Sequence, residues 1–448
     1  MRRPARAFRL LVAFCSAGVV ACGWLGPAPA TQEPAAGATP SPPAYRGAAY
    51  ELDPRHPVSA MELTGLGREL FFDASLSASG RSSCAGCHDP ARAFAPANAL
   101  PVQLAGADGV TPGVRAVPSL RYLQTVPPFS EHAFENEGDD SIDAGPNGGR
   151  TWDGRAGSAH EQAKLPLLSP FEMGNAAPGD VVTRLRAASY APRFRALWGD
   201  DIFDRPADAF AAAAMALEVY QERPEEFQPF SSKYDAVLRG AAELSASEAR
   251  GRAAFDDPTR GNCASCHPSE PKEAGSAPLF SDFGYVAIGL PRNRAIAANA
   301  DPRYVDLGLC GPLRQDLRDR VEYCGAFRVP TLRNVATRQS FFHNGVVHDL
   351  DQAVRFYATR DTDPARWYGR DGRGRPRHFD DLPAPYQANV NREAPFGGAP
   401  GDPPLLSEGD VRDIAAFLKT LTDADVATDA SPAAQPSTRR VARRPAGG

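Results

Sequence analysis

The sequence has no hydrophobic run long enough to cross a membrane, no excess of basic charge and very few methionines. The apolar run Leu10–Val20 is too short for a stable bilayer span. The 49 lysines and arginines are outnumbered by 54 aspartates and glutamates, so the net charge of −5 gives no support to nucleic-acid binding. The four methionines are Met1, Met61, Met173 and Met215, which leaves the second half of the chain without a thioether.

Two five-residue motifs stand out, Cys84-Ala-Gly-Cys-His88 and Cys263-Ala-Ser-Cys-His267. In Cys-x-x-Cys-His the two thiols attach covalently to a porphyrin, and the adjacent imidazole ligates its iron. A redox pair or a zinc site is the alternative, but zinc requires a second Cys or His pair at short spacing, and neither motif has one. The sequence therefore predicts two c-type haems, held by Cys84, Cys87, His88, Cys263, Cys266 and His267.

The N-terminus is typical of an export signal, with a basic start followed by the apolar run. The run ends in Val19-Val20-Ala21-Cys22, which resembles a bacterial lipobox, so residues 1–22 are the predicted signal peptide and Cys22 the predicted lipid-bearing residue. Cleavage after Ala30, releasing a soluble protein, is the alternative. We expect a periplasmic protein that is lipid-anchored to the outer membrane of a Gram-negative bacterium, with a Pro- and Ala-rich tether at 23–56.

Two cysteines remain once the haem motifs and the leader, with Cys15 and Cys22, are assigned. These are Cys310 and Cys324. Because an exported protein resides in an oxidising compartment, the pair is a candidate disulfide.

The 40 glycines and 43 prolines predict short helices separated by long irregular loops. A helix-then-motif order occurs twice. Gly65–Phe72 precedes the first motif, and a helix that begins at the capping box Ser245-Ala-Ser-Glu248 and runs to about Phe255 precedes the second. A third helix, with one apolar face, begins at Ser407–Asp410.

We therefore expect a mainly α-helical fold of two tandem cytochrome c-like haem domains with long loops. The first domain is predicted at 57–235 and the second at 236–424, with the last helix packing within its own domain or back on the first. A disordered tail is predicted at 425–448.

The sixth ligand of the second iron is not determined by spacing. Because no methionine follows the second motif, the candidates are His343, His348, His378, a tyrosine or no ligand.

Several ordered motifs between Leu63 and Leu421 resemble the bacterial di-haem cytochrome c peroxidase and MauG family. They are Phe71-Phe-Asp-Ala-Ser-Leu-Ser-Ala-Ser-Gly80, Trp152-Asp-Gly-Arg155, Pro170-Phe-Glu-Met-Gly174, Val329-Pro-Thr-Leu-Arg-Asn334 and Phe342-His-Asn-Gly345. A second set is similar to the subgroup MbnH, a MauG relative associated with copper-handling gene clusters that oxidises a tryptophan of a companion protein to kynurenine. Its motifs are Leu309-Cys-Gly-Pro312, Tyr323-Cys-Gly325, Phe356-Tyr-Ala-Thr-Arg-Asp361, Asp380-Asp-Leu-Pro383 and Asn389-Val-Asn391.

The resemblance implies a ligand for the second iron. The position that holds methionine in conventional peroxidases holds Tyr357 here, as it holds tyrosine in MauG. A phenolate is a hard donor that stabilises higher oxidation states of iron, whereas a thioether favours ferrous iron. His343 would then be a structural residue or a neighbour of the haem.

The resemblance also implies an open first haem. Conventional enzymes ligate this iron with a histidine from the loop after the motif, and Leu104 stands at that position. Over the open face it places Glu172 as general acid and base, Gln162 as its hydrogen-bonding neighbour, and Pro166. Trp152 would lie between the haems as an electron relay.

Two further expectations come from the family. A calcium ion lies between the haems in family members, but Ala116 stands where an asparagine ligand belongs, which leaves only carbonyls of Arg338 and Ser340. Arg333 is the candidate contact for a haem propionate.

The expected function is a di-haem oxidoreductase that uses hydrogen peroxide to reach a high-valent di-haem state and oxidises a tryptophan on a copper-binding periplasmic partner protein. The alternatives are a conventional cytochrome c peroxidase supplied by a small cytochrome c or cupredoxin, and a non-catalytic di-haem electron carrier.

Overall fold

The computed structural model describes residues 58–136, 139–271 and 276–426. The leader with Cys15 and Cys22, the whole tether and residues 427–448 of the tail lie outside these residues, so the signal peptide, lipid site and disordered tail remain predictions. Within the described ranges no helix is long and apolar enough to span a bilayer.

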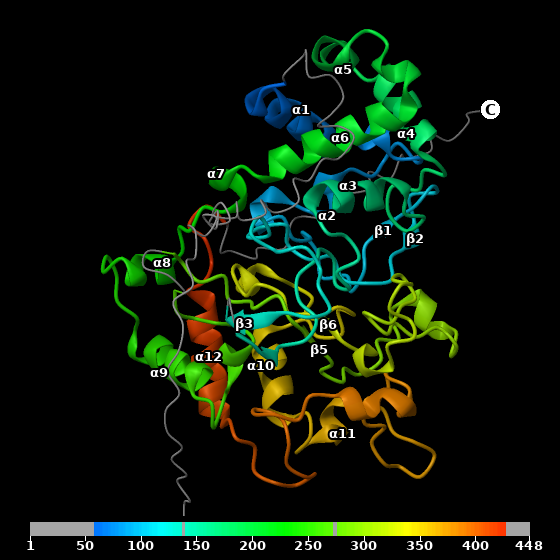
Figure 1. Ribbon diagram of the computed structural model, residues 1–448. Helices are drawn as coiled ribbons and strands as arrows, with labels where there is room; N and C mark the ends of the chain where they lie inside the picture. Colours follow the sequence, from blue (N-terminus) through cyan, green and yellow to red (C-terminus); the bar gives the residue numbers. More distant parts are fainter. Residues whose placement is uncertain (1–57, 137–138, 272–275, 427–448) are drawn as a thin grey trace, which may run out of the picture. The chain divides into compact units, whose positions relative to one another are not determined.

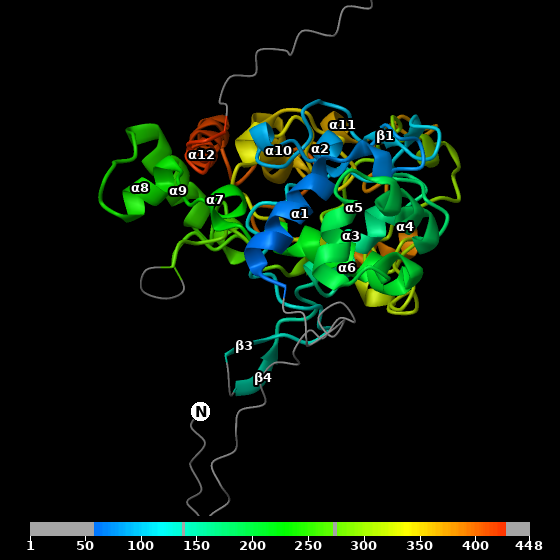
Figure 2. The ribbon, with the colours of Figure 1, turned by 90° about the horizontal axis from the view of Figure 1, so that it is seen from above.

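The chain is mostly helical with a few short strands, which confirms the predicted fold class (Figure 1). The helices of six or more residues are α1 (Ala60–Phe72), α3 (Ala159–Leu168), α4 (Pro178–Ala187), α5 (Ala191–Trp198), α6 (Pro206–Gln221), α8 (Lys233–Leu238), α9 (Ala246–Asp256), α10 (Leu350–Thr359) and α12 (Glu408–Lys419). The strands form antiparallel pairs: β1 (Leu104–Ala105) with β2 (Thr111–Pro112), β3 (Phe134–Asn136) with β4 (Asp139–Asp143), and β5 (Tyr285–Val286) with β6 (Phe327–Arg328). The β3–β4 pair is visible as a hairpin in Figure 2.

The first hydrophobic core is built around the packing of α1 on α6. Helix α1 begins at a capping box in which Ser59 and Glu62 satisfy each other's backbone amides. Its apolar face is buried against α6, and Figures 1 and 2 show the two helices side by side. At the crossing a Cβ on Gly67 would lie 1.9 Å from the Ala216 carbonyl oxygen, so only glycine permits this approach.

The second core repeats this arrangement with α9 and α12. The predicted N-terminal capping box of α9, Ser245 with Glu248, is present, and α12 begins with a second capping box, Ser407 with Asp410. A Cβ on Gly251 would lie 1.9 Å from the Asp413 carbonyl oxygen, so a glycine again allows two helices to cross closely. The apolar residues expected on α12 are buried, which confirms its predicted face: Val411, Ile414, Ala415 and Leu418.

The two cores are built mainly from successive parts of the chain. The first contains residues from Leu63 to Phe227 together with Phe283, and the second contains residues from Tyr234 to Leu421. Helix α12 packs on α9 and α10, and the residues directly after it reach the first half through an ion pair between Asp423 and Arg121. The domain limits at 57–235 and 236–424 remain a prediction.

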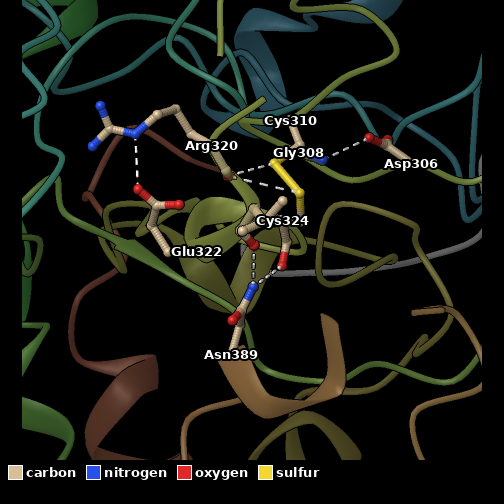
Figure 3. The surroundings of a disulfide bond; sticks show 8 residues. Asp306, Gly308, Cys310, Arg320, Glu322, Cys324 and Asn389 are labelled. Carbon is tan, nitrogen blue, oxygen red and sulfur yellow. Dashed lines mark hydrogen bonds and ion pairs between the residues drawn. A yellow bond between two sulfur atoms is a disulfide. The ribbon is translucent and has the colours of Figure 1, made fainter. Parts of the chain in front are cut away.

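Cys310 and Cys324 form a disulfide across 14 residues of the chain (Figure 3). The loop that it closes is tied to the C-terminal part, because Asn389 donates hydrogen bonds from Nδ2 to the carbonyl oxygens of Val321 at 2.8 Å and Cys324 at 3.0 Å. Strand β6 follows this loop directly and carries residues that line the functional site.

Candidate active site

The first motif lies on a single helical turn, α2 (Cys84–Cys87), with His88 directly after it. The Nδ1 atom of His88 lies 3.0 Å from the carbonyl oxygen of Phe94. Because a carbonyl only accepts, Nδ1 carries the proton and the lone pair of Nε2 is available to a metal. Burial lowers the pKa of His88 to about 4, so the ring is neutral.

The second motif repeats this geometry. The Nδ1 atom of His267 lies 2.8 Å from the carbonyl oxygen of Phe280, and burial lowers the pKa of His267 to about 4. Phe94 and Phe280 both have positive φ angles, 57° and 53°, a strained conformation that the surrounding structure must hold. The backbone rather than a carboxylate thus orients both imidazoles.

A hydroxyl supports each of these strained loops. Ser119 donates to the carbonyl oxygen of Ala93 at 2.5 Å, and Thr331 donates to that of Leu279 at 2.6 Å. Each acceptor directly precedes the phenylalanine that orients an imidazole. The sequence analysis missed both residues, although Val-Pro-Ser-Leu-Arg at 117–121 and Val-Pro-Thr-Leu-Arg at 329–333 are a repeat that signals them.

A first cavity surrounds the first motif and contains the predicted catalytic residues. It is lined by Cys84, Cys87, His88, Trp152, Arg155, Gln162, Pro166 and Glu172, among others. His88 is the one histidine among the described residues that line it. Leu104 is 52% exposed and is absent from the lining, so the face opposite His88 has no competing imidazole.

Glu172 is held on a tight turn after α3. Gly174, with a φ angle of 71°, closes the turn by donating from its amide to the Ser169 carbonyl oxygen at 2.9 Å. The carboxyl group of Glu172 is accessible from the cavity, and protein surrounds the cavity. Burial therefore raises the pKa of Glu172, while Arg155 and a hydrogen bond from Ser169 oppose the rise. The raised pKa brings proton exchange by this carboxyl group closer to neutral pH than that of an ordinary glutamate.

A second cavity surrounds the second motif and is more apolar in character. Its lining includes Cys263, Cys266, His267, Tyr357, Phe342, Val354 and Leu418. Tyr357 lies on α10 and stacks on Phe396 with 5.2 Å between ring centroids. Burial and the nearby thiols of Cys263 and Cys266 raise the pKa of Tyr357. The phenol is therefore protonated at neutral pH unless a cation binds it.

Of the histidine candidates for the second iron, only His343 lines the second cavity. Its ring stacks on Phe327 with 3.4 Å between centroids, and Trp152 packs edge-on to it. Its Nε2 is buried without a hydrogen-bond partner, and burial lowers its pKa to about 3. His348 and His378 bond to backbone carbonyls instead.

Trp152 lines both cavities. Its Nε1 donates to the Ala116 carbonyl oxygen at 2.7 Å, and Ala116 in turn donates from its amide to the His343 carbonyl oxygen at 2.7 Å. Asp153 fixes the turn through ion pairs with Arg115 at 2.7 Å and Arg155 at 2.8 Å. Burial opposes ionisation, but these two arginines lower the pKa of Asp153 to about 2. The indole is therefore part of the wall that both cavities share, together with Pro118, Leu123 and Arg328.

Arg328 also lines both cavities and has no ion pair with the described residues. It is 6% exposed, and its Nε and Nη1 atoms have no hydrogen-bond partner. Burial lowers its pKa to about 10. A buried cation without an anion is costly, and a porphyrin propionate would supply the missing charge. The four motif cysteines are free thiols, so both cavities fit a covalently attached haem.

Comparison with known proteins agrees with this geometry. The family model for di-haem cytochrome c peroxidases matches residues 61–243. The chain is 36% identical to the methylamine utilization protein MauG of Paracoccus denitrificans over 382 residues, which cover 81% of this chain and 88% of that protein. The chain belongs to the di-haem cytochrome c peroxidase and MauG family. It is thus an oxidoreductase with two c-type haems, as the motifs predicted.

Two solved structures of this family extend the likeness. The diheme peroxidase BthA from Burkholderia thailandensis is 39% identical with a TM-score of 0.73, and the match covers 83% of this chain and 87% of BthA. A MauG-like protein associated with microbial copper homeostasis is 25% identical with a TM-score of 0.56, and the match covers 83% of this chain and 91% of that protein.

For two expectations taken from the family, the structure shows contacts with other partners. Arg333 is buried and pairs through both terminal nitrogens with Asp235, at 3.0 and 2.9 Å, so its charge is already neutralised. At the expected calcium position the Ser340 carbonyl oxygen accepts from Nε of Arg338 at 3.1 Å. The part of the chain that the structure describes contains no group of three or more acidic, Cys or His side chains able to hold a metal.

Proposed function

We propose that the protein uses hydrogen peroxide at the first cavity to oxidise a tryptophan on a partner protein in the periplasm. The observation that carries this proposal is the difference between two cavities that share one wall. The first contains Glu172 and Gln162 together with the oriented His88, and the second contains Tyr357. A simple electron carrier needs no carboxyl group with a raised pKa in the cavity beside its haem motif.

The proposed role of Glu172 is to move a proton. A haem held by Cys84, Cys87 and His88 supplies the redox chemistry of peroxide cleavage. Glu172 takes a proton from the oxygen nearer the iron and returns it to the distal oxygen, which leaves as water. Gln162 lines the same cavity and positions the peroxide by hydrogen bonding.

Tyr357 is proposed to be a ligand for the iron of a haem that Cys263, Cys266 and His267 would hold. Tyr357 and His267 sit on the lining of one cavity, and the thiols that attach the haem are close enough to affect the pKa of the phenol. His343 is the weaker candidate, because it is stacked against Phe327 and lies toward Trp152. An anionic oxygen ligand would favour the oxidised states that a peroxide-driven oxidant needs.

Trp152 and Arg328 are proposed to serve both haems. The indole of Trp152 forms part of the wall that the two cavities share, where it can relay an electron between the two haem sites. The buried guanidinium of Arg328 would bind a propionate, which would satisfy both the charge and the unpartnered nitrogens.

The partner is proposed to be a tryptophan-bearing, copper-binding protein, by analogy with the copper-associated relative. A protein substrate cannot enter either cavity, so its oxidation has to proceed through electron transfer across the protein. The proposal also includes a lipid anchor at Cys22, which lies outside the described residues, and a bound calcium ion.

The test is a peroxide reaction of the holoprotein followed by two methods. EPR and optical spectra of the resting ferric protein should show one high-spin and one low-spin haem, and one equivalent of peroxide should give a long-lived oxidised state. Addition of a tryptophan-containing peptide should discharge that state and yield oxidised tryptophan by mass spectrometry. Rapid turnover with a reduced small cytochrome c and no tryptophan oxidation would identify a conventional peroxidase instead. Two low-spin haems without a peroxide response would identify a carrier.

A further inference from the structure

The segment 366–377, which begins in the last two residues of helix α11 (Pro364–Trp367), is an exposed and strongly basic hairpin on an acidic protein. It contains one acidic residue, Asp371, and five arginines, all of them exposed: Arg366, Arg370, Arg373, Arg375 and Arg377. The whole chain has a net charge of −5, so this concentration of positive charge is not a property of the surface in general. We call this segment the basic hairpin.

The basic hairpin has a defined conformation. Arg370 and Pro376 form an antiparallel bridge, and Asp371 donates from its amide to the Arg375 carbonyl oxygen at 2.8 Å. The carboxylate of Asp371 accepts from the amides of Arg373 and Arg375 and pairs with the Arg375 guanidinium at 3.0 Å. The single acidic residue is thus used to fix the turn.

The remaining charges are largely uncompensated. The side chains of Arg373 and Arg377 make no hydrogen bond or ion pair with the described residues. Arg370 donates only to the Gly374 carbonyl oxygen. Unpaired arginines held on a fixed turn form a surface that attracts an acidic partner and can bind its carboxylates in a bidentate manner.

The basic hairpin is joined to the wall of the second cavity by aromatic packing. The guanidinium of Arg366 lies 5.4 Å from the centroid of the Trp367 ring, and Trp367 packs edge-on to Phe356 at 5.4 Å. Phe356 in turn packs on Tyr357 at 6.1 Å. Tyr368, directly after Trp367, is buried and donates to the Gly289 carbonyl oxygen at 2.5 Å, which fixes the start of the hairpin.

We infer that the basic hairpin is the docking surface for an acidic face of the partner protein. This inference rests on the proposed function, in which the partner is the substrate. Docking here would place the partner beside the aromatic residues that lead to Tyr357. Opposite charges would steer the encounter and orient the partner, and the association would weaken as ionic strength rises.

The test uses the holoprotein and two synthetic peptides that differ only in charge. Each contains one tryptophan, flanked by glutamates in one peptide and by lysines in the other. Binding is measured by fluorescence anisotropy at low and high salt, and peroxide-dependent tryptophan oxidation by mass spectrometry. The variant is Arg373→Glu/Arg377→Glu. The matched control is Arg186→Glu/Arg239→Glu, which makes the same charge change at exposed positions of α4 and at the end of α8.

The wild type and the control should bind the acidic peptide at least about tenfold more tightly than the hairpin variant does at low salt, with little difference at high salt. The hairpin variant should keep both haem spectra. Equal binding of the acidic peptide by the hairpin variant and the wild type would overturn the inference. Binding that depends on the hairpin, without tryptophan oxidation in either peptide, would support the docking surface and contradict the proposed function. Equal oxidation of both peptides by the wild type and the hairpin variant would support the function and contradict the docking surface.

Discussion

Tyr122 donates a hydrogen bond from its hydroxyl to Oδ1 of Asp423 at 2.7 Å, joining residues that are 301 positions apart. The other oxygen of Asp423 accepts from Arg121 at 2.9 Å and from Asn334 at 2.7 Å. Arg121 ends the first copy of the repeated Val-Pro-Ser/Thr-Leu-Arg pattern, and Asn334 directly follows the second copy. One carboxylate that is 1% exposed therefore connects the loops behind both haem sites.

The substitution Asp423→Asn should lower the free energy of unfolding by about 3 kcal/mol, because it removes one partner of a buried ion pair. Chemical denaturation of the holoprotein measures this. The control is Asp425→Asn, which also removes a partner of Arg121 but whose side chain is 50% exposed, so a loss below about 1 kcal/mol is expected. Equal losses for the two variants would show that burial of Asp423 is unimportant.

Glu172→Gln should slow the reaction with peroxide by about 10²-fold or more, because an amide cannot take the proton. The pKa of Glu172 is raised from the ordinary 4.5 by burial, so the wild-type rate should fall as the pH is lowered through that raised value. This fall of the rate at low pH, the acidic limb of the pH profile, should be absent from Glu172→Gln. Stopped-flow mixing over a pH series measures both effects.

The control for this experiment is Glu161→Gln. Glu161 lies in the first turn of α3, accepts a hydrogen bond from the Gly157 amide at 2.7 Å and does not line the first cavity. The rate and the pH profile of Glu161→Gln should match those of the wild type. A wild-type acidic limb that persists in Glu172→Gln would assign the proton transfer to another group.

Tyr357→Met should raise the reduction potential of the second haem and shorten the life of the oxidised state, because a thioether favours ferrous iron. Potentiometric titration and optical spectra after peroxide addition measure these effects. Tyr368→Phe is the matched control, since Tyr368 is a buried tyrosine of the same half that bonds to Gly289 and does not line the cavity. An unchanged potential in Tyr357→Met would exclude the phenol as the ligand.

Trp152→Phe should preserve the resting spectra but reduce the yield of the oxidised state shared by the two haems, because the shared wall loses its oxidisable indole. The lost hydrogen bond to Ala116 should cost about 1 kcal/mol of stability. Trp198→Phe, in the first core and away from both cavities, should leave the yield unchanged. An undiminished yield in Trp152→Phe would remove the indole from the electron path.

Replacing both Cys310 and Cys324 by serine should lower stability by about 3 kcal/mol, the entropic value for a loop of this length. Thermal unfolding measures the loss, and the haem absorbance at low temperature should stay that of the wild type. Reduction of the wild-type disulfide should reproduce the shift. A changed haem spectrum would show that the loop shapes the active site.

The sequence predicted those features that depend on residues close together in the chain. The haem motifs, the capping box at Ser245 and the apolar face of α12 are local patterns with a local physical cause. The contacts of Asp423 and the position of Arg328 between two cavities arise from pairings across the chain, and no local signal specifies them. The propionate contact expected at Arg333 came from family resemblance, whereas the structure pairs this arginine with Asp235.

Each imidazole donates a hydrogen bond from Nδ1 to a backbone carbonyl oxygen. His88 donates to Phe94, and His267 donates to Phe280. A carbonyl cannot accept that proton outright as a carboxylate can, so neither ring gains imidazolate character. Haems held by the two motifs would therefore have histidine ligands oriented in the same way. We expect any difference between them in spin state, potential or reactivity to arise from the other residues of the two cavities, where Glu172 lines the first and Tyr357 the second.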